Sequence, residues 1–321
     1  LVQLEYSGFD GATVPICTFT LAKRNIEEMS GCYIRLSDFP GAKNQPIKTR
    51  EAVLNKDCGF YFETKNTDFS SIPGSPIAYW ASDRVREIFR KGNALAKITE
   101  PKTGLQTSDT QRFLRLWYEV YINKIGFAYS SCIEAQKSEK KWFPHNKGGM
   151  YRKWYGNRDY IVNWQDDGKE IKCFTDKDGR LLSRPQNTQY YFMSCVSWTL
   201  ISSGKFSVRF FENGFIFDVS GSAFFPKTQD ILYYTGLFNT PICDKFLGFL
   251  NPTLNYSPGA IGNIPVLHTY ESKKTQIDAL VEQNIAISKD DWDSFETSWD
   301  FQQHPLIRFK TNDKIADSFK A

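Results

Sequence analysis

The sequence has little of what common catalytic and metal sites are built from. Histidine occurs three times in 321 residues, at distant positions, and no G-x-S-x-G or Cys/His pattern accompanies it, so nucleophilic catalysis has no support. The seven cysteines are scattered and never in C-x-x-C spacing, which excludes a disulfide framework or a structural zinc site and fits a reducing cytoplasm. The G-x-x-x-x-G-K-[ST] phosphate loop is also missing.

Long apolar runs, internal repeats and low-complexity tracts are absent too. No run approaches the roughly 20 apolar residues that span a bilayer, so a membrane protein is not expected. Hydrophobic residues make up 41% and charged residues 24%, which is typical of a globular protein. The length of 321 residues suits about two domains.

Positive charge is concentrated in one segment. The whole chain has a net charge of +4, yet residues 137–158 hold seven Lys or Arg and one Glu, a local +6, so the rest is close to −2. Basicity gathered in one place indicates contact with a polyanion more than general solubility.

Within this segment, PHNKGGMYRKWYG at 144–156 has no strand or helix periodicity and mixes cations, aromatics and glycines. We expect its glycines to let the backbone approach a phosphate, its cations to neutralise charge and its aromatics to stack on a base or sugar. An equally open alternative is a solvated basic loop whose aromatics close a core edge. The candidate residues are Lys147, Gly148, Gly149, Arg152, Lys153, Trp154, Tyr155 and Arg158.

Two further polar segments are candidates for DNA contact. GLQTSDTQRF follows a predicted strand, although ordinary turn chemistry is the favoured explanation of its polar residues. LISSGKFSVRF places hydroxyl and cationic groups at the start of a strand, and alternation there predicts that Arg209 faces solvent or a ligand. The candidate residues are Thr107, Asp109, Arg112, Ser202, Ser203, Lys205 and Arg209.

Periodicity and capping signals predict several elements. Hairpins are expected over residues 13–36 and around Glu212-Asn213-Gly214, and a strand over 94–98. Helices are expected after Ser82, over 230–239, over 241–250 and, with Ser288 as its cap, near the end of the chain. Asp159, Glu170 and Lys172 superficially fit a metal-dependent nuclease pattern, but the signal is very weak.

The chain resembles one family over nearly its whole length. The strings that carry the resemblance are SIPGSPIAYW, GLQTSDTQRFLRLWYEV, KWFPHNKGGMYRKWYGNRDYIVNWQDDG, SWTLISSGKFSVRF, GFIFDVSGSAFFP, YYTGLFNTPICDKFLGFLNPTLNYSPGAIGNIPV and ISKDDWDSFETSWDF. They are similar to strings of the PglX-like adenine-specific DNA methyltransferases of BREX phage-defence systems and of related restriction-modification methyltransferases.

The resemblance implies an α+β fold with a mixed β-sheet target recognition domain and flanking helices, preceded by the last β-hairpin of a class I methyltransferase domain. We therefore expect the edge of the catalytic domain over 1–65 and a helical connector over 271–321. Residues 66–270 would form a recognition domain similar to those of TaqI-like methyltransferases and type I specificity subunits.

The resemblance also implies the function. In this family an S-adenosylmethionine loop and a catalytic Asn-Pro-Pro-Tyr/Phe motif precede these strings, and the chain has neither; Asn251-Pro252-Thr253 and Phe39-Pro40-Gly41 are the nearest. We expect no catalytic, cofactor-binding or metal-binding residue here, and no activity in isolation. The intact enzyme would use S-adenosylmethionine in the cytoplasm to methylate an adenine flipped out of the duplex.

Double-stranded DNA, the protein's own N-terminal catalytic domain and other defence-system subunits are the expected partners. A second hypothesis makes the chain a protein-interaction module of a defence complex that does not read DNA directly. The aromatic and acidic segment from Trp292 to Asp300 favours that hypothesis, whereas the basic loop favours DNA.

Overall fold

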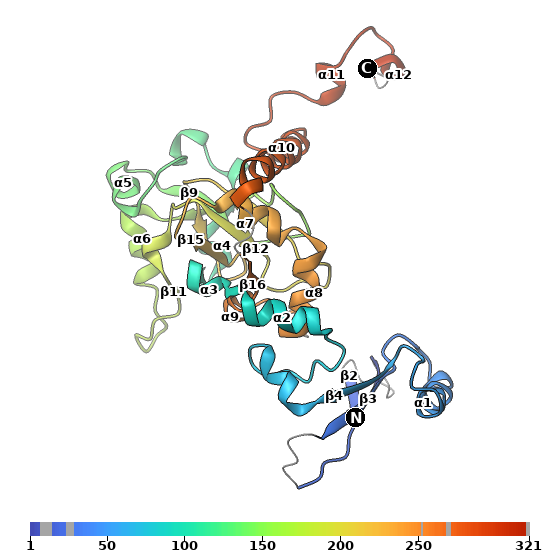
Figure 1. Cartoon of the computed structure of the whole chain (residues 1–321). Helices are drawn as coiled ribbons and strands as arrows, with labels where there is room; N and C mark the ends of the chain where they lie inside the picture. Colours follow the sequence, from blue (N-terminus) through green and yellow to red (C-terminus); the bar gives the residue numbers. More distant parts are fainter. Residues whose placement is uncertain (7–14, 24–28, 252, 268–270, 319–321) are drawn as a thin grey trace. The chain divides into compact units, whose positions relative to one another are not determined.

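The computed structural model describes residues 1–6, 15–23, 29–251, 253–267 and 271–318 (Figure 1). The chain divides into two compact units, Leu1–Gly92 and Asn93–Ala321. Both helices and sheets are present in each, so the α+β expectation is confirmed at that level. No helix in the described ranges has the length and apolar character to cross a membrane.

The first unit is built on a four-stranded sheet in the order β2-β1-β3-β4. Its strands are β1 (Val2–Tyr6), β2 (Pro15–Thr18), β3 (Ser30–Arg35) and β4 (Tyr61–Lys65). The hairpin predicted over 13–36 is wrong in its pairing, because β1 lies between β2 and β3, antiparallel to one and parallel to the other. Residues 13–14 and 24–28 of that segment lie outside the described residues.

Three helices accompany this sheet. The helix α1 (Asn44–Leu54) and the 3-10 helix η1 (Asn66–Ser71) contact its strands, and α2 (Asp83–Lys91) packs on η1. Ile34, Leu36 and Ala52 form the centre of the core. The predicted cap of α2 is confirmed, since the Ser82 side chain accepts a hydrogen bond from the Val85 amide.

The second unit contains two four-stranded sheets that share one hydrophobic core. The first has the order β14 (Ile216–Phe217), β9 (Trp142–Asn146), β10 (Tyr160–Asn163), β8 (Leu114–Leu116). The second has the order β13 (Val208–Phe211), β12 (Cys195–Trp198), β15 (Ala223–Pro226), β6 (Thr99–Lys102). Two-stranded pairs join β11 (Arg184–Pro185) to β7 (Leu105–Gln106) and β16 (Pro265–Val266) to β5 (Asn93–Ala94).

Short helices connect these strands. They are α3 (Leu95–Ile98), α4 (Thr110–Phe113), α5 (Cys132–Lys137), α6 (Gln165–Lys172), α7 (Ile231–Phe238), α8 (Pro241–Leu250) and α9 (Pro258–Gly262). Single 3-10 turns lie at η2 (Trp117–Glu119), η3 (Ile122–Lys124), η4 (Thr188–Tyr190) and η5 (Glu271–Lys273). The predicted start of α8 is confirmed, with Thr240 at the N-cap and Pro241 at the first helical position.

Two local predictions in this unit are wrong. Residues 95–98 form the helical turn α3 rather than a strand. The turn at Glu212-Asn213-Gly214 exists, but β13 pairs with β12 while β14 pairs with β9, so the chain passes there from one sheet to the other. Asn213 supports the passage by accepting the Ser194 amide at 2.8 Å, and Gly214 donates its amide to Phe192 O.

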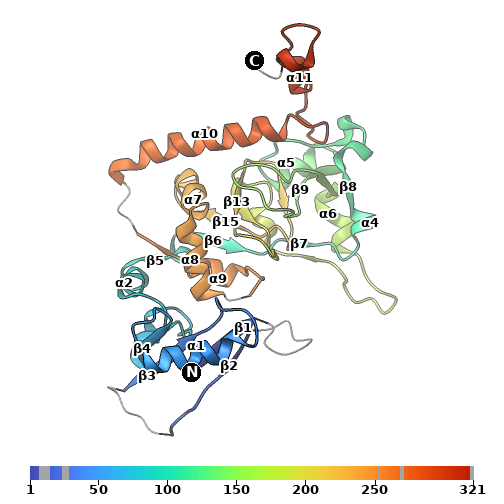
Figure 2. The same ribbon diagram turned by 90° about the vertical axis from the view of Figure 1, so that its right-hand side faces the viewer.

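A long helix, α10 (Lys274–Trp292), follows and lies against α7 (Figure 2). Ser288 is inside this helix, so the predicted capping role is wrong: the helix that contains Ile277 continues without a break to Trp292. Asp290 and Asp291 therefore lie in the last turn, where the helix dipole disfavours acidic groups. The short helices α11 (Pro305–Arg308) and α12 (Ile315–Ser318) come after it.

Candidate nucleic-acid interface

The basic loop leaves β9 at Asn146 and turns back through two glycines in left-handed conformations. A Cβ on Gly148, at φ +75°, would lie 2.5 Å from the carbonyl oxygen of Ser220, and one on Gly149 would lie 3.0 Å from the amide of Asn157. Gly148 also donates its amide to Asn146 Oδ1. Both positions require glycine because the backbone there packs closely against Ser220 and Asn157 of the same chain. No phosphate is needed to explain the two glycines.

Two of the predicted phosphate-binding cations in the loop already have partners. Arg152 Nη1 lies 2.9 Å from Asp291 Oδ2, and its guanidinium lies over the ring of Trp292, with 5.0 Å to the ring centre. Lys153 Nζ donates to the Asn239 carbonyl at 2.7 Å. These contacts attach the loop to α10 and to the end of α7, which corrects the expectation that both side chains face DNA.

The aromatic and last basic positions of the loop are structural as well. Trp154 pairs with β13 through its backbone, donating to Val208 O and accepting from Phe210 N, each at 2.9 Å. Tyr155 is buried beneath the guanidinium of Arg158, which lies 3.7 Å from its ring centre. The ring of Tyr155 therefore closes a core edge, as in the alternative interpretation of the loop, whereas Trp154 is half-buried and held through its backbone.

Arg158 is 1% exposed and makes a two-pronged ion pair with Glu212. Burial opposes the charge of Glu212, but the hydrogen bonds and the charge of Arg158 outweigh it and hold the pKa of Glu212 below its usual value. The charge of Arg158 is thus neutralised and covered, and the predicted contact of this residue with DNA stays a prediction. Lys147 remains free of carboxylate partners among the described residues, and its Nζ lies 5.0 Å from the ring centre of Tyr160.

The segment 104–113 uses most of its polar groups locally. Thr107 is buried, and Asp109 caps α4 by accepting the Arg112 amide at 3.0 Å, so ordinary turn chemistry explains both. Arg112 is exposed, and its guanidinium lies over Phe113 and Phe174, with 5.0 and 5.2 Å to the ring centres. Only Arg112 of this group presents a cation at the surface.

The third predicted segment, LISSGKFSVRF at 200–210, lines a small polar cleft together with the basic loop. Gly149 and Tyr151 come from the loop, whereas Ser202 and Lys205 come from the connection between β12 and β13. Thr199, Phe206, Ser207 and Tyr256 complete the lining. Lys205 and the neighbouring Ser203 are exposed. We call this the Lys205 cleft; it joins two segments predicted separately.

Arg209 lies directly behind the Lys205 cleft. Its side chain is fully buried, and Nη2 donates to Thr199 Oγ1 at 3.2 Å while Nη1 lies 3.4 Å from Arg152 O. Nε has no partner in the described part of the chain, and no carboxylate there pairs with the guanidinium. Burial lowers the pKa of Arg209 to about 10. The expectation that it faces solvent is wrong, because Trp154 pairs with β13 beside it and the Arg152 carbonyl lies against its guanidinium.

Thr199, Tyr151 and Tyr256 were missed by sequence reasoning. Thr199 links the cleft to the buried charge: its hydroxyl donates to Gly149 O at 2.9 Å and accepts from Arg209. A single threonine after a strand carries no spacing signal. Tyr151 lies within the basic loop, but its charged neighbours gave the stronger signal for a binding site.

A second buried polar group holds the base of the loop. His145 Nε2 lies 3.2 Å from Asp218 Oδ2, and Asn146 Nδ2 donates to Ser197 Oγ at 2.6 Å, which links β9 to β12. Burial would raise the pKa of Asp218, but the hydrogen bond and charge of His145 hold it below its usual value. These contacts fix where the loop begins.

The weak nuclease pattern is not assembled. Lys172 pairs with Asp167, and Glu170 lies 3.8 Å from Lys141 instead of beside Lys172. Burial raises the pKa of Asp159, with the charge of Arg152 opposing. Within the described ranges no three His, Cys, Asp or Glu side chains are placed to hold a metal ion.

Comparison with known proteins gives close relatives but no matching family model. The chain is 36% identical over 300 residues to the adenine-specific methyltransferase PglX of Lacticaseibacillus casei (strain Zhang), covering 92% of this chain and 24% of that protein. It is 36% identical over 276 residues to the adenine-specific methyltransferase BrxX of Escherichia coli O9:H4 (strain HS), covering 84% and 21%.

Among solved structures, the chain resembles the Type IIL restriction-modification enzyme MmeI in complex with DNA, with a TM-score of 0.42 and 12% identity. That match covers 71% of this chain and 32% of the MmeI chain. The chain spans about a quarter of the length of the curated relatives it matches. The resemblance found in the sequence is confirmed: over most of its length, the chain is related to adenine-specific methyltransferases of the PglX and BrxX type.

Proposed function

We propose that this chain is the DNA-recognition segment of a site-specific N6-adenine DNA methyltransferase of phage defence. It would hold duplex DNA and present the target adenine to a catalytic domain formed elsewhere in the intact enzyme. The observation that carries the proposal is the Lys205 cleft with the buried Arg209 behind it, in a chain related to adenine-specific methyltransferases.

The electrostatics of the Lys205 cleft favour an anion. Lys205 contributes an exposed ammonium, and Ser202 and Tyr151 contribute hydroxyl donors. Arg209 adds a charge that no carboxylate in the described residues neutralises, in surroundings of low dielectric where its field is screened less than at the surface. A DNA phosphate meets these requirements, and such contacts fix position on the duplex without reading sequence.

Sequence reading requires side chains that reach base edges. Of the predicted residues, Arg112 and Ser203 are exposed and not committed to an ion pair among the described residues. We place base contacts there, with Lys147 as a further phosphate contact. An arginine recognises guanine through two parallel hydrogen bonds in the major groove, which suits Arg112 once it leaves the ring of Phe174.

The chain's own residues do not fit S-adenosylmethionine chemistry. Phe39 of the nearest tetrapeptide-like string packs edge-on against Phe60, with 4.7 Å between ring centres, inside the core of the first unit. Asn251 donates to Asn255 O at 2.7 Å and so ties its own loop. S-adenosylmethionine and the catalytic motif would therefore belong to the remainder of a cytoplasmic enzyme, with residues 1–65 as the edge of its catalytic domain, 66–270 as its recognition domain and 271–321 as a connector.

A salt series tests the DNA proposal. Lys205→Ala should weaken binding to cognate and random duplexes alike, and should flatten the slope of log K against log salt by about 0.9 for the lost phosphate contact. Lys177→Ala is the matched control, since Lys177 is exposed on a loop that shares no residue with the cleft. Fluorescence anisotropy with the intact enzyme measures both. An unchanged slope in Lys205→Ala would remove the cleft from the interface.

A further inference from the structure

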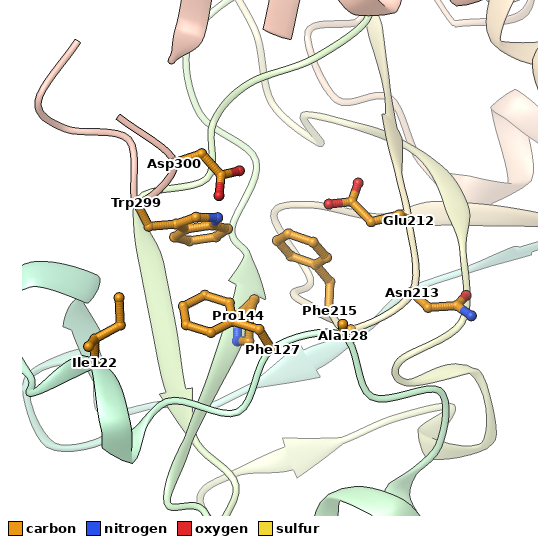
Figure 3. Close-up of a pocket in the computed structure, with 10 residues that line it drawn as sticks. Ile122, Phe127, Ala128, Pro144, Glu212, Asn213, Phe215, Trp299 and Asp300 are labelled. Carbon is orange, nitrogen blue, oxygen red and sulfur yellow. The ribbon is translucent and has the colours of Figure 1, made fainter. Parts of the chain in front are cut away.

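A second pocket lies on a different part of the same unit and has the opposite electrical character. It has a volume of about 320 Å³ and is lined by aromatic side chains and two carboxylates. Figure 3 shows Trp299, Phe127 and Phe215 grouped together, with Glu212 and Asp300 on the same side of the rings. None of the described residues that line it is basic, and none of them lines the Lys205 cleft.

The aromatic wall is fixed by contacts around it. The ring of Trp299 lies 5.4 Å from that of Phe127 and 6.0 Å from that of Phe215, measured between ring centres. The segment that carries Trp299 is held by the indole of Trp117, which donates to Thr297 O at 2.8 Å, and by Ser298, which donates to Asp293 Oδ1 at 2.6 Å. The pocket is thus present before any ligand arrives.

The two carboxylates are half-exposed at the mouth of the pocket, at 51% for Glu212 and 49% for Asp300. Lys289 Nζ lies 3.0 Å from Asp300 Oδ2, and Arg158 pairs with Glu212, so a cation orients each carboxylate. Burial opposes the charge of Lys289, but its hydrogen bonds to Asp293 and Asp300 raise the pKa of Lys289 above its usual value.

The charge around the pocket excludes a polyanion. Six carboxylates lie on the pocket and on the last turn of α10 and the segment after it, against four cations beside them, which leaves −2. The carboxylates are Glu212, Asp290, Asp291, Asp293, Glu296 and Asp300, and the cations are Arg152, Arg158, Lys289 and Arg308. Phosphates are repelled by such a field, whereas a cation is attracted.

We propose that this pocket binds an arginine side chain of a partner protein. A guanidinium is planar and weakly hydrated, so it stacks on an indole face and at the same time offers parallel N–H donors to a carboxylate. Trp299 supplies the stacking surface, and Asp300 supplies the acceptor. The volume lies at the small end of ligand sites, which suits one side chain rather than an extended ligand.

The exposed rim agrees with a protein partner. Ile122 lines the pocket and is 59% exposed, and its chain neighbour Tyr121 is 81% exposed. Large apolar groups around a charged anchor are typical of protein interfaces. The proposal is independent of DNA recognition, because the two sites share no lining residue.

The test uses the full chain labelled with 5-fluorotryptophan, with the Trp299 resonance assigned by Trp299→Phe. The probes are the peptide acetyl-Gly-Arg-Gly-amide and the same peptide with citrulline, which keeps the shape of arginine and lacks its charge. The arginine peptide should shift the Trp299 resonance saturably, with a Kd in the millimolar range, and the citrulline peptide should bind at least about tenfold more weakly.

Asp300→Asn should weaken the arginine peptide about tenfold, the loss of one charge-assisted hydrogen bond. Glu282→Gln, which removes a charge from the exposed side of α10 outside the pocket, should leave the affinity unchanged. Equal binding of the two peptides by the unmodified chain, or a Trp299 resonance that moves with duplex DNA and not with the arginine peptide, would overturn the proposal. The citrulline comparison keeps the test decisive if Asp300→Asn disturbs the fold.

Discussion

Replacing Arg209 with Met tests whether its buried charge contributes to DNA binding or to the stability of the fold. The pKa of Arg209 is about 10 rather than 12.5, and at 1.36 kcal/mol per pKa unit its buried charge costs folding on the order of 3 kcal/mol. Arg209→Met removes this cost and loses the hydrogen bonds to Thr199 and Arg152, each about 1 kcal/mol. The free energy of unfolding should therefore stay unchanged or rise by about 1 kcal/mol.

DNA binding should respond in the other direction. A phosphate oxygen at the mouth of the Lys205 cleft, on the far side of Thr199 from Arg209, would lie on the order of 7 Å from the guanidinium, about two contact distances. At an effective dielectric constant of about 20, two unit charges at that distance attract by roughly 2 kcal/mol. Arg209→Met should accordingly weaken duplex binding about 30-fold.

Arg158→Met is the matched control. Arg158 is equally buried, but its charge is paired with Glu212 and packed over Tyr155. Its removal should lower the free energy of unfolding by about 2–3 kcal/mol, less than for a fully buried pair because Glu212 remains half-exposed, and should leave DNA affinity unchanged in the folded protein. Urea unfolding and fluorescence anisotropy measure the two quantities. A large stability loss in Arg209→Met with unchanged DNA affinity would refute the reasoning.

Two further predictions concern the base of the loop. Gly148→Ala should lower the free energy of unfolding by about 1–3 kcal/mol, because the new Cβ meets a backbone carbonyl, whereas Gly179→Ala, at a similar φ but in open space, should cost only about 1 kcal/mol; equal losses in urea unfolding would contradict this. Because the folded-state pKa of Asp218 lies below its ordinary 3.8, its stabilisation is present above that pH and lost as the pH falls below it. In Asp218→Asn the free energy of unfolding should fall less steeply as the pH drops below 3.8. An unchanged dependence on pH would show that the contact with His145 contributes nothing to stability.

Local signals in the sequence predicted local structure. The Ser82 cap and the Thr240-Pro241 start of α8 follow from hydrogen bonding and φ preference within a few residues, and both are confirmed. Pairing is decided by distant parts of the chain, so the two predicted hairpins failed although their strands exist: β1 inserts in one, and the turn at Asn213 changes sheets in the other.

The candidate site shows the same difference between local signals and contacts made by distant parts of the chain. A count of charges located a basic segment, but not that Asp291 and Glu212 would be brought to it from 139 and 54 residues away. Alternation predicted that Arg209 faces solvent or a ligand, but it gives no information on what covers each face of β13, and Arg209 is buried. Trp154 pairs with β13 beside Arg209 and the Arg152 carbonyl lies against its guanidinium, and only the folded chain places them there.

Exchange of the recognition segment tests the central claim most directly. The stretch of the Lacticaseibacillus casei PglX that aligns with residues 93–267 would be replaced by that of this chain, and methylated adenines would be mapped across the genome of cells that express the chimera. If this segment reads DNA, adenine methylation moves to a different sequence motif. Methylation that continues at the original motif would contradict the account.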